Sequence, residues 1–223
     1  MRVCVAIDGP AAAGKSTVAK RVATLLGYTY IDTGAMYRAF TLYCIEKGIN
    51  CEDEKACVEV IPEVNIELKP GNLVFLNGKD VSFDIRTPIV NANVSYIASY
   101  KDIRLALVDL QRKMAEKDSV IMDGRDIGTY VLPNAEVKIY QIASAETRAI
   151  RRYKENQEKG IACTLDEIRE DVKKRDYIDS HRAFAPLKPA EDAIPLDTSD
   201  MSIEEVVDAI IKIINEKIKE IDG

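Results

Sequence analysis

GPAAAGKST, residues 9–17, is the stretch of sequence that decides the fold of this chain. It satisfies the phosphate-loop pattern of a glycine, four residues, a second glycine, a lysine and a serine or threonine. Glycine lets the backbone approach a ligand closely, so that successive amides can surround phosphate oxygens. The residues predicted to bind a nucleoside triphosphate are Gly9, Pro10, Ala11, Ala12, Ala13, Gly14, Lys15, Ser16 and Thr17. Among them, Lys15 adds positive charge at the phosphates and Ser16 is the expected Mg²⁺ ligand.

The sequence on both sides of the loop fits this interpretation. Residues 2–7, RVCVAI, form a short apolar run suited to a buried strand, and residues 16–26, STVAKRVATLL, have helical spacing that ends at Gly27. Strand, glycine-rich loop and helix follow one another in the order that places a phosphate at a helix N-terminus. The alternative is a turn rich in Gly and Ala that only joins a strand to a helix, and the flanking pattern argues against it.

Composition limits the class of protein. The chain has 223 residues, enough for one domain with small inserts, and it has no stretch of the roughly 20 apolar residues that a membrane helix needs. Asp8, Gly9 and Pro10 interrupt the N-terminal apolar residues before a signal peptide could form, so we expect a cytoplasmic protein. Five cysteines without paired CxxC spacing predict reduced thiols rather than disulfides or a zinc site.

Charge argues against a general nucleic-acid surface, because the net charge is −6. Residues 148–182 are different, since they hold 10 Lys and Arg against 8 Asp and Glu. A local excess of positive charge of this size suits a small anion.

Strands and helices are expected to alternate, which is the pattern of a parallel α/β fold. The expected strands are 2–7, 28–31, 119–123, 137–142 and 193–197. The expected helices are 15–26, 35–47, 87–98, 101–117, 145–159, 165–179 and 202–220, the last capped by Ser202. Between residues 62 and 86, strand-like runs separated by Pro70-Gly71-Asn72 and Asn77-Gly78 predict a small antiparallel insert. Residues 77–80, NGKD, hold the residue types of a guanine-reading motif in the wrong order, and a turn with solvated charges is the better interpretation.

Two arginines that follow predicted strands indicate a second substrate site. Arg38 ends residues 31–38, IDTGAMYR, where Thr33 is expected to cap a helix, and Arg125 lies in residues 123–126, DGRD. In an open parallel sheet such strand ends face the ligand crevice, and arginine binds phosphate with two parallel N–H groups. The pair predicts a site for a second phosphate. The alternatives are a solvated helix position for Arg38 and an ion pair of Arg125 with Asp123 or Asp126.

These motifs together resemble those of the bacterial cytidylate (CMP) kinases, within the adenylate-kinase-like nucleoside monophosphate kinases. The resemblance rests on IDGPAAAGKST, DTGAMYR, the end of the insert at residues 84–87, residues 95–104, DGRDIG and residues 174–187. It runs from residue 5 to about 198, and DGRD-x-G and RDxxDxxR are its most specific parts. The family implies a P-loop NTPase fold with a five-stranded parallel sheet flanked by helices, a substrate-binding insert and a mobile lid. It also implies transfer of the γ-phosphoryl group of ATP, with Mg²⁺, to CMP or dCMP, giving CDP or dCDP and ADP in pyrimidine nucleotide metabolism.

The resemblance also implies roles for the residues at matching positions. Arg38 and Arg125 would hold the acceptor phosphate, with Thr33 nearby. The residues expected around the cytosine are Ser95, Arg104 and Asp126, since a carboxylate and an arginine complement the amino donor and the acceptors of that base. The residues expected at the pentose and the transferring phosphate are Arg175, Asp179 and Arg182. On spacing alone, an ordinary helix hydroxyl, surface charges and a solvated salt-bridge ladder would explain the same residues.

Catalysis is expected to rest on positive charge and alignment rather than on a general base, since the acceptor phosphate is already an anion. The residues expected to be catalytic are Lys15, Arg125, Arg151, Arg152 and Arg182. Arg148, Arg151 and Arg152 would belong to the lid, and which of them reaches the phosphates stays open. Asp123, or Asp8, could bind Mg²⁺ through water, and Asp123 could instead hold Arg125 by an ion pair.

We expect one P-loop kinase domain over residues 1–223, with a core of 1–61 and 87–223, a nucleotide-binding insert at 62–86 and a lid at about 146–164. The expected partners are the small molecules CMP and dCMP, with no nucleic acid and no membrane, and a monomer is expected. Two alternatives stay open. A kinase for a hydroxyl acceptor would need a general base, and the paired arginines argue against it; a nucleotide-dependent switch would carry a guanine-reading motif, which the sequence lacks.

Overall fold

The structure, a computed structural model, describes residues 1–158 and 160–222. Lys159, which falls within the expected helix 145–159 and the expected lid, lies outside the described residues. The chain divides into two compact units: unit 1 is Met1–Tyr30 with Asp118–Gly223, and unit 2 is Ile31–Lys117. Within the described ranges, no helix is both long and apolar enough to cross a membrane.

A five-stranded parallel sheet confirms the expected α/β fold class. Its strands are β1 (Cys4–Asp8), β2 (Thr29–Asp32), β6 (Val120–Gly124), β7 (Val137–Ile142) and β8 (Ile194–Asp197), in the spatial order β2-β6-β1-β7-β8. All five residues of β1 are buried, as expected for a central strand of a parallel sheet. β1 pairs with β6 so that Asp8 stands opposite Gly124. This register brings the phosphate loop, which follows β1, beside the DGRD segment at the end of β6.

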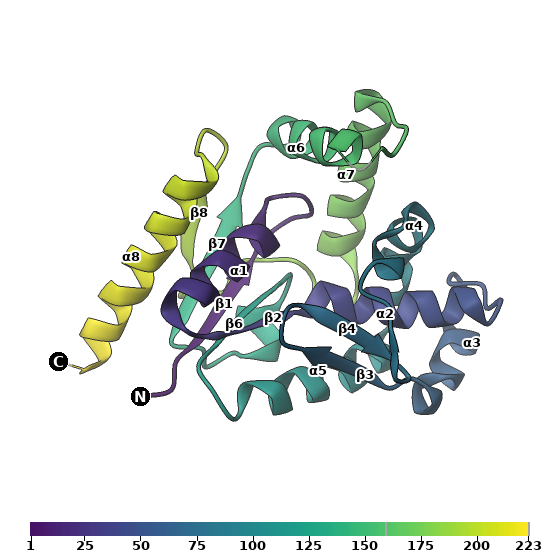
Figure 1. The fold of residues 1–223 in the computed structure, drawn as a ribbon, viewed down its shortest axis with the longest axis horizontal. Helices are drawn as coiled ribbons and strands as arrows, with labels where there is room; N and C mark the ends of the chain where they lie inside the picture. Colours follow the sequence, from purple (N-terminus) through teal and green to yellow (C-terminus); the bar gives the residue numbers. More distant parts are fainter. Residues whose placement is uncertain (159, 223) are drawn as a thin grey trace. The chain divides into compact units, whose positions relative to one another are not determined.

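The helices of unit 1 are α1 (Lys15–Leu26), α6 (Ala145–Glu158), α7 (Leu165–His181) and α8 (Ile203–Asp222). α1 and α8 pack against each other and against the sheet, as Figure 1 shows for the purple and yellow helices. Val18 and Val22 of α1 and Ile210 and Ile214 of α8 share one buried cluster with the strands, because apolar residues three and four positions apart lie on one helix face. α6 and α7 pack together around a smaller cluster.

One element of unit 1 was not predicted from the sequence. Residues Ile127–Val131, directly after DGRD, form a π-helical turn. The amides of Tyr130 and Val131 both donate to the carbonyl oxygen of Asp126, at 2.8 and 3.1 Å. Such turns often mark functional sites, and this one fixes the backbone of a residue expected to contact the cytosine.

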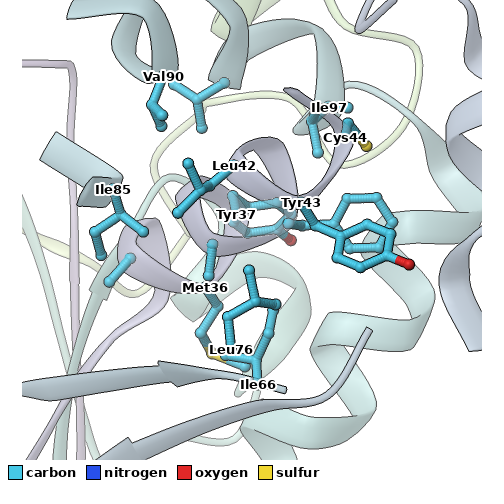
Figure 2. Packing of buried hydrophobic residues seen from close by; sticks show 14 of the residues in the cluster. Met36, Tyr37, Leu42, Tyr43, Cys44, Ile66, Leu76, Ile85, Val90 and Ile97 are labelled. Atoms are coloured by element: carbon cyan, nitrogen blue, oxygen red, sulfur yellow. The ribbon is translucent and has the colours of Figure 1, made fainter. Parts of the chain in front are cut away.

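Unit 2 contains the predicted antiparallel insert. Its three-stranded sheet is formed by β3 (Ile66–Lys69), β4 (Leu73–Leu76) and β5 (Lys79–Asp80). The helices of unit 2 are α2 (Thr33–Glu46), α3 (Glu54–Glu59), α4 (Pro88–Ile97) and α5 (Lys101–Ala115), with two 3₁₀ turns at Ile61–Glu63 and Asp84–Arg86. Met36 of α2 packs on Ile66 and Leu76 of the small sheet, and Val90 and Ile97 of α4 belong to the same core (Figure 2). α2 is therefore buried on most sides, which explains why it is apolar nearly all round.

The start of α2 differs from the prediction. Asp32, not Thr33, is the N-cap, because its carboxylate accepts the amide of Ala35 at 2.8 Å. Thr33 is instead the first residue of the helix and is buried. Asp is as good an N-cap as Ser and better than Thr, so the choice agrees with local preference. The cap on α8 is confirmed: the amide of Glu205 donates to the hydroxyl of Ser202, and the Glu205 carboxylate accepts the amide of Ser202.

Candidate functional site

The phosphate loop has a conformation that only glycine allows at its first position. Gly9 has a φ of +154°, and a Cβ at this position would lie 1.9 Å from the carbonyl oxygen of Gln141, so only glycine fits. Lys15 turns back over the loop, and its Nζ donates to the carbonyl oxygens of Gly9 and Pro10 at 2.8 and 2.7 Å. Burial, followed by the charge of Arg125, lowers the pKa of Lys15. Phosphate oxygens at this place would supply the negative charge that the buried ammonium needs.

Ser16 and Asp123 meet beside the loop. The hydroxyl of Ser16 donates to Oδ2 of Asp123 at 2.8 Å, and the hydroxyl of Tyr30 donates to Oδ1 at 2.7 Å. A hydroxyl and a carboxylate are the oxygen donors that Mg²⁺ binds, usually together with water and substrate phosphates. In the described part of the chain, no group of three or more His, Cys, Asp and Glu side chains could hold a metal alone. The residues present therefore fit an ion that shares its ligands with a bound nucleotide.

Arg125 pairs with a residue that sequence reasoning did not name as its partner. Its Nε donates to Oδ2 of Asp179, on α7, at 2.7 Å, whereas Asp123 and Asp126 were the expected alternatives. Burial opposes ionisation of Asp179, but the guanidinium groups of Arg125, Arg175 and Arg182 hold its pKa below the ordinary value. The carboxylate thus stays ionised and holds Arg125 toward α7.

The carboxylate of Asp126 pairs with Arg182, just past the end of α7. Nη2 of Arg182 donates to Oδ1 of Asp126 at 3.1 Å, and both side chains are almost fully buried. Nε of Arg182 also donates to the carbonyl oxygen of Ala185 at 2.7 Å, which fixes the guanidinium. Arg175 is half-buried, and its burial, followed by the charge of Arg125, lowers its pKa to about 10. One buried and two half-buried arginines with two carboxylates form a strong site for a phosphorylated ligand.

The three expected lid arginines are held differently. Arg148 donates to the carbonyl oxygens of Ala143 and Ala11 and makes a two-fold contact with Asp176 at 3.0 and 2.6 Å. Arg151 donates to the carbonyl oxygens of Ala13, Thr198 and Met201. Arg152 instead makes an ion pair with Glu155, one turn away on α6, at 3.0 Å. Two of the arginines therefore support the phosphate loop and its surroundings.

In unit 2, the carboxylate of Asp32, at the start of α2, interacts with the positive charges of Arg86 and Arg38. Nη2 of Arg86 donates to Oδ2 of Asp32 at 2.7 Å. Burial opposes ionisation of Asp32, but Arg86 and then Arg38 lower its pKa. Nε of Arg38 donates to the side chain of Asn91 at 3.3 Å. Arg86 was predicted only as the last residue of the insert, without a role, and its position there and its charge were the only signals.

The residues of unit 2 expected at the cytosine lie in a buried polar setting. Ser95, on α4, has a buried Oγ for which the described residues offer no hydrogen-bond partner. Arg104, on α5, is 1% exposed; its Nη1 donates to the carbonyl oxygen of Ala98 at 2.9 Å, and its guanidinium lies 5.2 Å from the centre of the Tyr37 ring. A buried arginine stacked on an aromatic ring is held rigidly, as recognition of a flat polar base requires.

The expected site residues therefore form two groups. One lies in unit 1 and comprises the phosphate loop with Arg125, Asp126, Arg175, Asp179 and Arg182. The other lies in unit 2 and comprises Thr33, Arg38, Ser95 and Arg104, joined by Arg86.

Comparison with known proteins gives one family. The cytidylate kinase family model matches residues 5–216. A cytidylate kinase of Anoxybacillus flavithermus is 52% identical and covers 98% of each chain, and one of Lactobacillus johnsonii is 56% identical over 96% of this chain and 95% of its own. An uncharacterized protein of Eubacterium ventriosum, 15% identical, superposes with a TM-score of 0.53 over 97% of this chain and 99% of its own, a likeness of fold alone. The matches to sequence extend over the phosphate loop, DGRD and α7, and the chain belongs to the cytidylate kinase family.

Proposed function

We propose that this chain transfers the γ-phosphoryl group of ATP to CMP or dCMP, giving ADP with CDP or dCDP. The observation that carries the proposal is the register of β1 with β6, which brings the phosphate loop beside DGRD. One segment would bind a nucleoside triphosphate, and the other ends in a buried carboxylate that suits a base. Membership of the family supports ATP as the donor.

On the donor side, the phosphate loop would bind the ATP phosphates through its backbone amides. Lys15 would leave the carbonyl oxygens that it now contacts and follow the β- and γ-phosphates. Ser16 and Asp123 would hold Mg²⁺, directly or through water. When bound, the ion would neutralise charge on the phosphates and orient them. Arg152 is the lid arginine that we propose for the transferring phosphoryl group, since Arg148 and Arg151 are bound to backbone carbonyls.

On the acceptor side, we propose that Arg125 of unit 1 binds the phosphate of CMP. For unit 2 we propose the same role for Arg38 and Arg86, with Thr33 near them. Arg175 and Asp179 would bind the pentose. Arg182 would place charge near the transferring phosphate while it holds Asp126 in position. Guanidinium groups held in place stabilise the negative charge that spreads over phosphate oxygens in the transition state.

Base selection would depend on Asp126, Ser95 and Arg104. Cytosine offers an amino donor to a carboxylate, whereas uracil would present a carbonyl oxygen there. Two buried acceptors facing each other are costly, so we expect CMP to be preferred over UMP by at least about 100-fold in kcat/KM. The unpartnered hydroxyl of Ser95 is consistent with a polar ligand at this place.

The test is ADP release with Mg-ATP and, in parallel, CMP, dCMP, UMP, AMP, GMP and dTMP. We expect fast turnover with CMP and dCMP alone. Asp126→Asn is the matched variant, because it keeps the size of the side chain and removes the charge that receives the amino group. Equal turnover with UMP in the natural protein would reject the proposed base selection, and turnover only with a sugar or another hydroxyl acceptor would reject the proposed reaction.

We further propose that the chain acts as a monomer on nucleotides dissolved in the cytoplasm. The support is the negative net charge and the buried, unpaired state of four of the five cysteines. Light scattering on purified protein should give the mass of one chain. A mass of two chains would overturn the proposal that the chain acts as a monomer.

A further inference from the structure

Asp8 is a buried carboxylate with no role in the proposed transfer. It is the last residue of β1 and directly precedes Gly9 of the phosphate loop. Oδ1 accepts the amide of Ile127 at 2.8 Å, and Oδ2 accepts the amide of Gly128 at 2.7 Å. Each carboxylate oxygen therefore binds one amide of the π-helical turn, which accounts for Asp8 better than the Mg²⁺ role considered from the sequence.

The turn that Asp8 holds also fixes Asp126. The amides bound by Asp8 belong to the two residues that follow Asp126, and the carbonyl oxygen of Asp126 accepts the amides of Tyr130 and Val131. The turn packs closely against β7 at Gly128, since a Cβ there would lie 3.1 Å from the side chain of Lys138. The backbone of Asp126 is thus held between Asp8 on one side and the rest of the turn on the other.

We propose that Asp8 is a positioning residue for base selection: by binding the amides of Ile127 and Gly128, it sets the place of the Asp126 carboxylate and so the preference for cytosine over uracil. The inference rests on the proposed role of Asp126. It also gives the residue before the phosphate loop a function on the acceptor side of the reaction.

Asp8→Asn is the informative variant, because it preserves shape but leaves only one acceptor for two amides. The other amide would face an NH₂ group, and an unsatisfied buried donor is costly. We expect the ratio of kcat/KM for CMP to that for UMP to fall by about 10- to 100-fold, mainly through a higher KM for CMP. The KM for ATP should stay within about threefold, because Lys15 and the loop amides are unchanged.

Thr129→Val is the matched control within the same turn. The Thr129 hydroxyl is buried, and among the described residues it has no hydrogen-bond partner, so its removal breaks no contact with Asp8 or Asp126. The control should keep the natural preference for CMP. A loss of preference in Thr129→Val equal to that in Asp8→Asn would mean that any change in the turn has this effect, and it would overturn the inference.

The remaining outcomes separate the inference from the proposed function. If Asp126→Asn loses the preference for CMP but Asp8→Asn keeps it, the base-selecting role of Asp126 stands and the inference about Asp8 fails. If Asp126→Asn itself keeps the preference, the proposed base selection fails first. An equal rise in the KM for ATP and for CMP in Asp8→Asn would instead assign Asp8 to the phosphate loop and would also overturn the inference.

Hydrogen exchange in the natural protein tests the contact without any variant. The amides of Ile127 and Gly128 should exchange at least about 100-fold more slowly than exposed loop amides, since both are buried and bonded to a carboxylate. Fast exchange at these two amides would overturn the inference even if Asp8→Asn did not fold.

Discussion

At the scale of single residues, the contact of Arg125 with Asp179 determines what a substitution should do. Arg125→Ala removes a guanidinium proposed to bind the acceptor phosphate and leaves Asp179 with Arg175 and Arg182 near it. We expect kcat/KM for CMP to fall by about 10²- to 10³-fold, because charge stabilisation of the transition state is lost. Steady-state kinetics with CMP measures this fall, and equilibrium binding of ATP should change little.

Arg125→Lys is the control for charge. Lysine keeps a positive charge but cannot offer the planar pair of N–H groups to a phosphate, so activity should lie between that of the natural protein and that of Arg125→Ala. A loss of ATP affinity as large as the loss of transfer in either variant would contradict the assignment of Arg125 to the acceptor.

The buried carboxylate of Asp8 should make stability depend on pH. Burial raises the pKa of Asp8 from 3.8 to about 6, with Asp126 adding to the rise, while the amides of Gly128 and Ile127 and the charge of Lys15 oppose it. The folded chain therefore holds a proton that the unfolded chain releases between about pH 4 and 6, and the stability this proton contributes is lost as the pH rises through 6. The size of the shift corresponds to about 3 kcal/mol.

Asp8→Asn isolates this contribution, because asparagine does not titrate. The free energy of unfolding of the variant minus that of the natural protein should rise between pH 4 and 6.5 and then level off. Denaturant titrations at a series of pH values measure the difference. A difference that does not change with pH would show that the pKa of Asp8 is the same in the folded and unfolded chains.

At the scale of elements, a substitution at Gly34, near the start of α2, should change substrate binding more than it changes the stability of the fold. A Cβ at Gly34 would lie 2.8 Å from Nη1 of Arg38, the mobile end of a long side chain. Gly34→Ala should therefore move the Arg38 guanidinium and raise the KM for CMP by about tenfold, the cost of a weakened charged contact. Stability should change by less than about 1 kcal/mol, because the helix preference of alanine over glycine is offset by crowding of the N-cap oxygen of Asp32, which would lie 3.3 Å from the added Cβ.

Gly27→Ala should give the opposite pattern. Gly27 ends α1 with a φ of +68°, and an added Cβ would meet nothing within 4 Å. An alanine there costs about 1 kcal/mol of backbone strain and touches no substrate residue. Thermal unfolding and the KM for CMP, measured on both variants, test the pair; equal effects of Gly34→Ala and Gly27→Ala on the KM would refute the proposed role of Arg38.

Sequence patterns predicted the long helices and the strands of the parallel sheet, but they missed the short helix α3 and the π-helical turn. The expected helix 15–26 and strand 137–142 have the bounds of α1 and β7, because apolar residues that recur over six or more positions leave a clear pattern in the sequence. α3, with six residues, and the π-helical turn Ile127–Val131 carry too few residues for a period to be visible. The conformation of the π-helical turn is held by contacts with Asp8, which lies far away in the sequence.

At the scale of the whole molecule, the sequence predicts the contiguous part of the site but not the contacts between residues that are far apart along the chain. The phosphate loop is contiguous, so its spacing alone predicts its conformation. The partners of Arg125 and Ser16 are 54 and 107 positions away, and no local pattern selects them. Family resemblance named Arg125 and Asp179 separately, but only folding pairs them. Arg86 was overlooked for the same reason, because its contact with Asp32 spans 54 positions.

The cysteines test the packing within each of the two units. Cys44, Cys51 and Cys57 lie in the core of unit 2, Cys4 is buried in β1, and Cys163 is partly exposed before α7. With a thiol reagent such as DTNB, we expect one fast reaction in the folded chain, at Cys163, and five reactions after unfolding. Absorbance counts the thiols, peptide mapping locates them, and Cys163→Ser should abolish the fast phase.

The labelling rate of Cys51 shows whether access of the reagent or ionisation of the thiol controls these reactions. A hydrogen bond from Cys44 lowers the pKa of Cys51 although burial opposes it, and the contact with Cys51, followed by burial, raises the pKa of Cys44. The thiolate is the reactive form, so ionisation alone would make Cys51 react early. Cys51 is only 3% exposed, and a reagent reaches it only when unit 2 opens. Labelling of Cys51 should therefore be as slow as that of Cys57, and fast labelling of Cys51 in the folded chain would contradict the packing of this core.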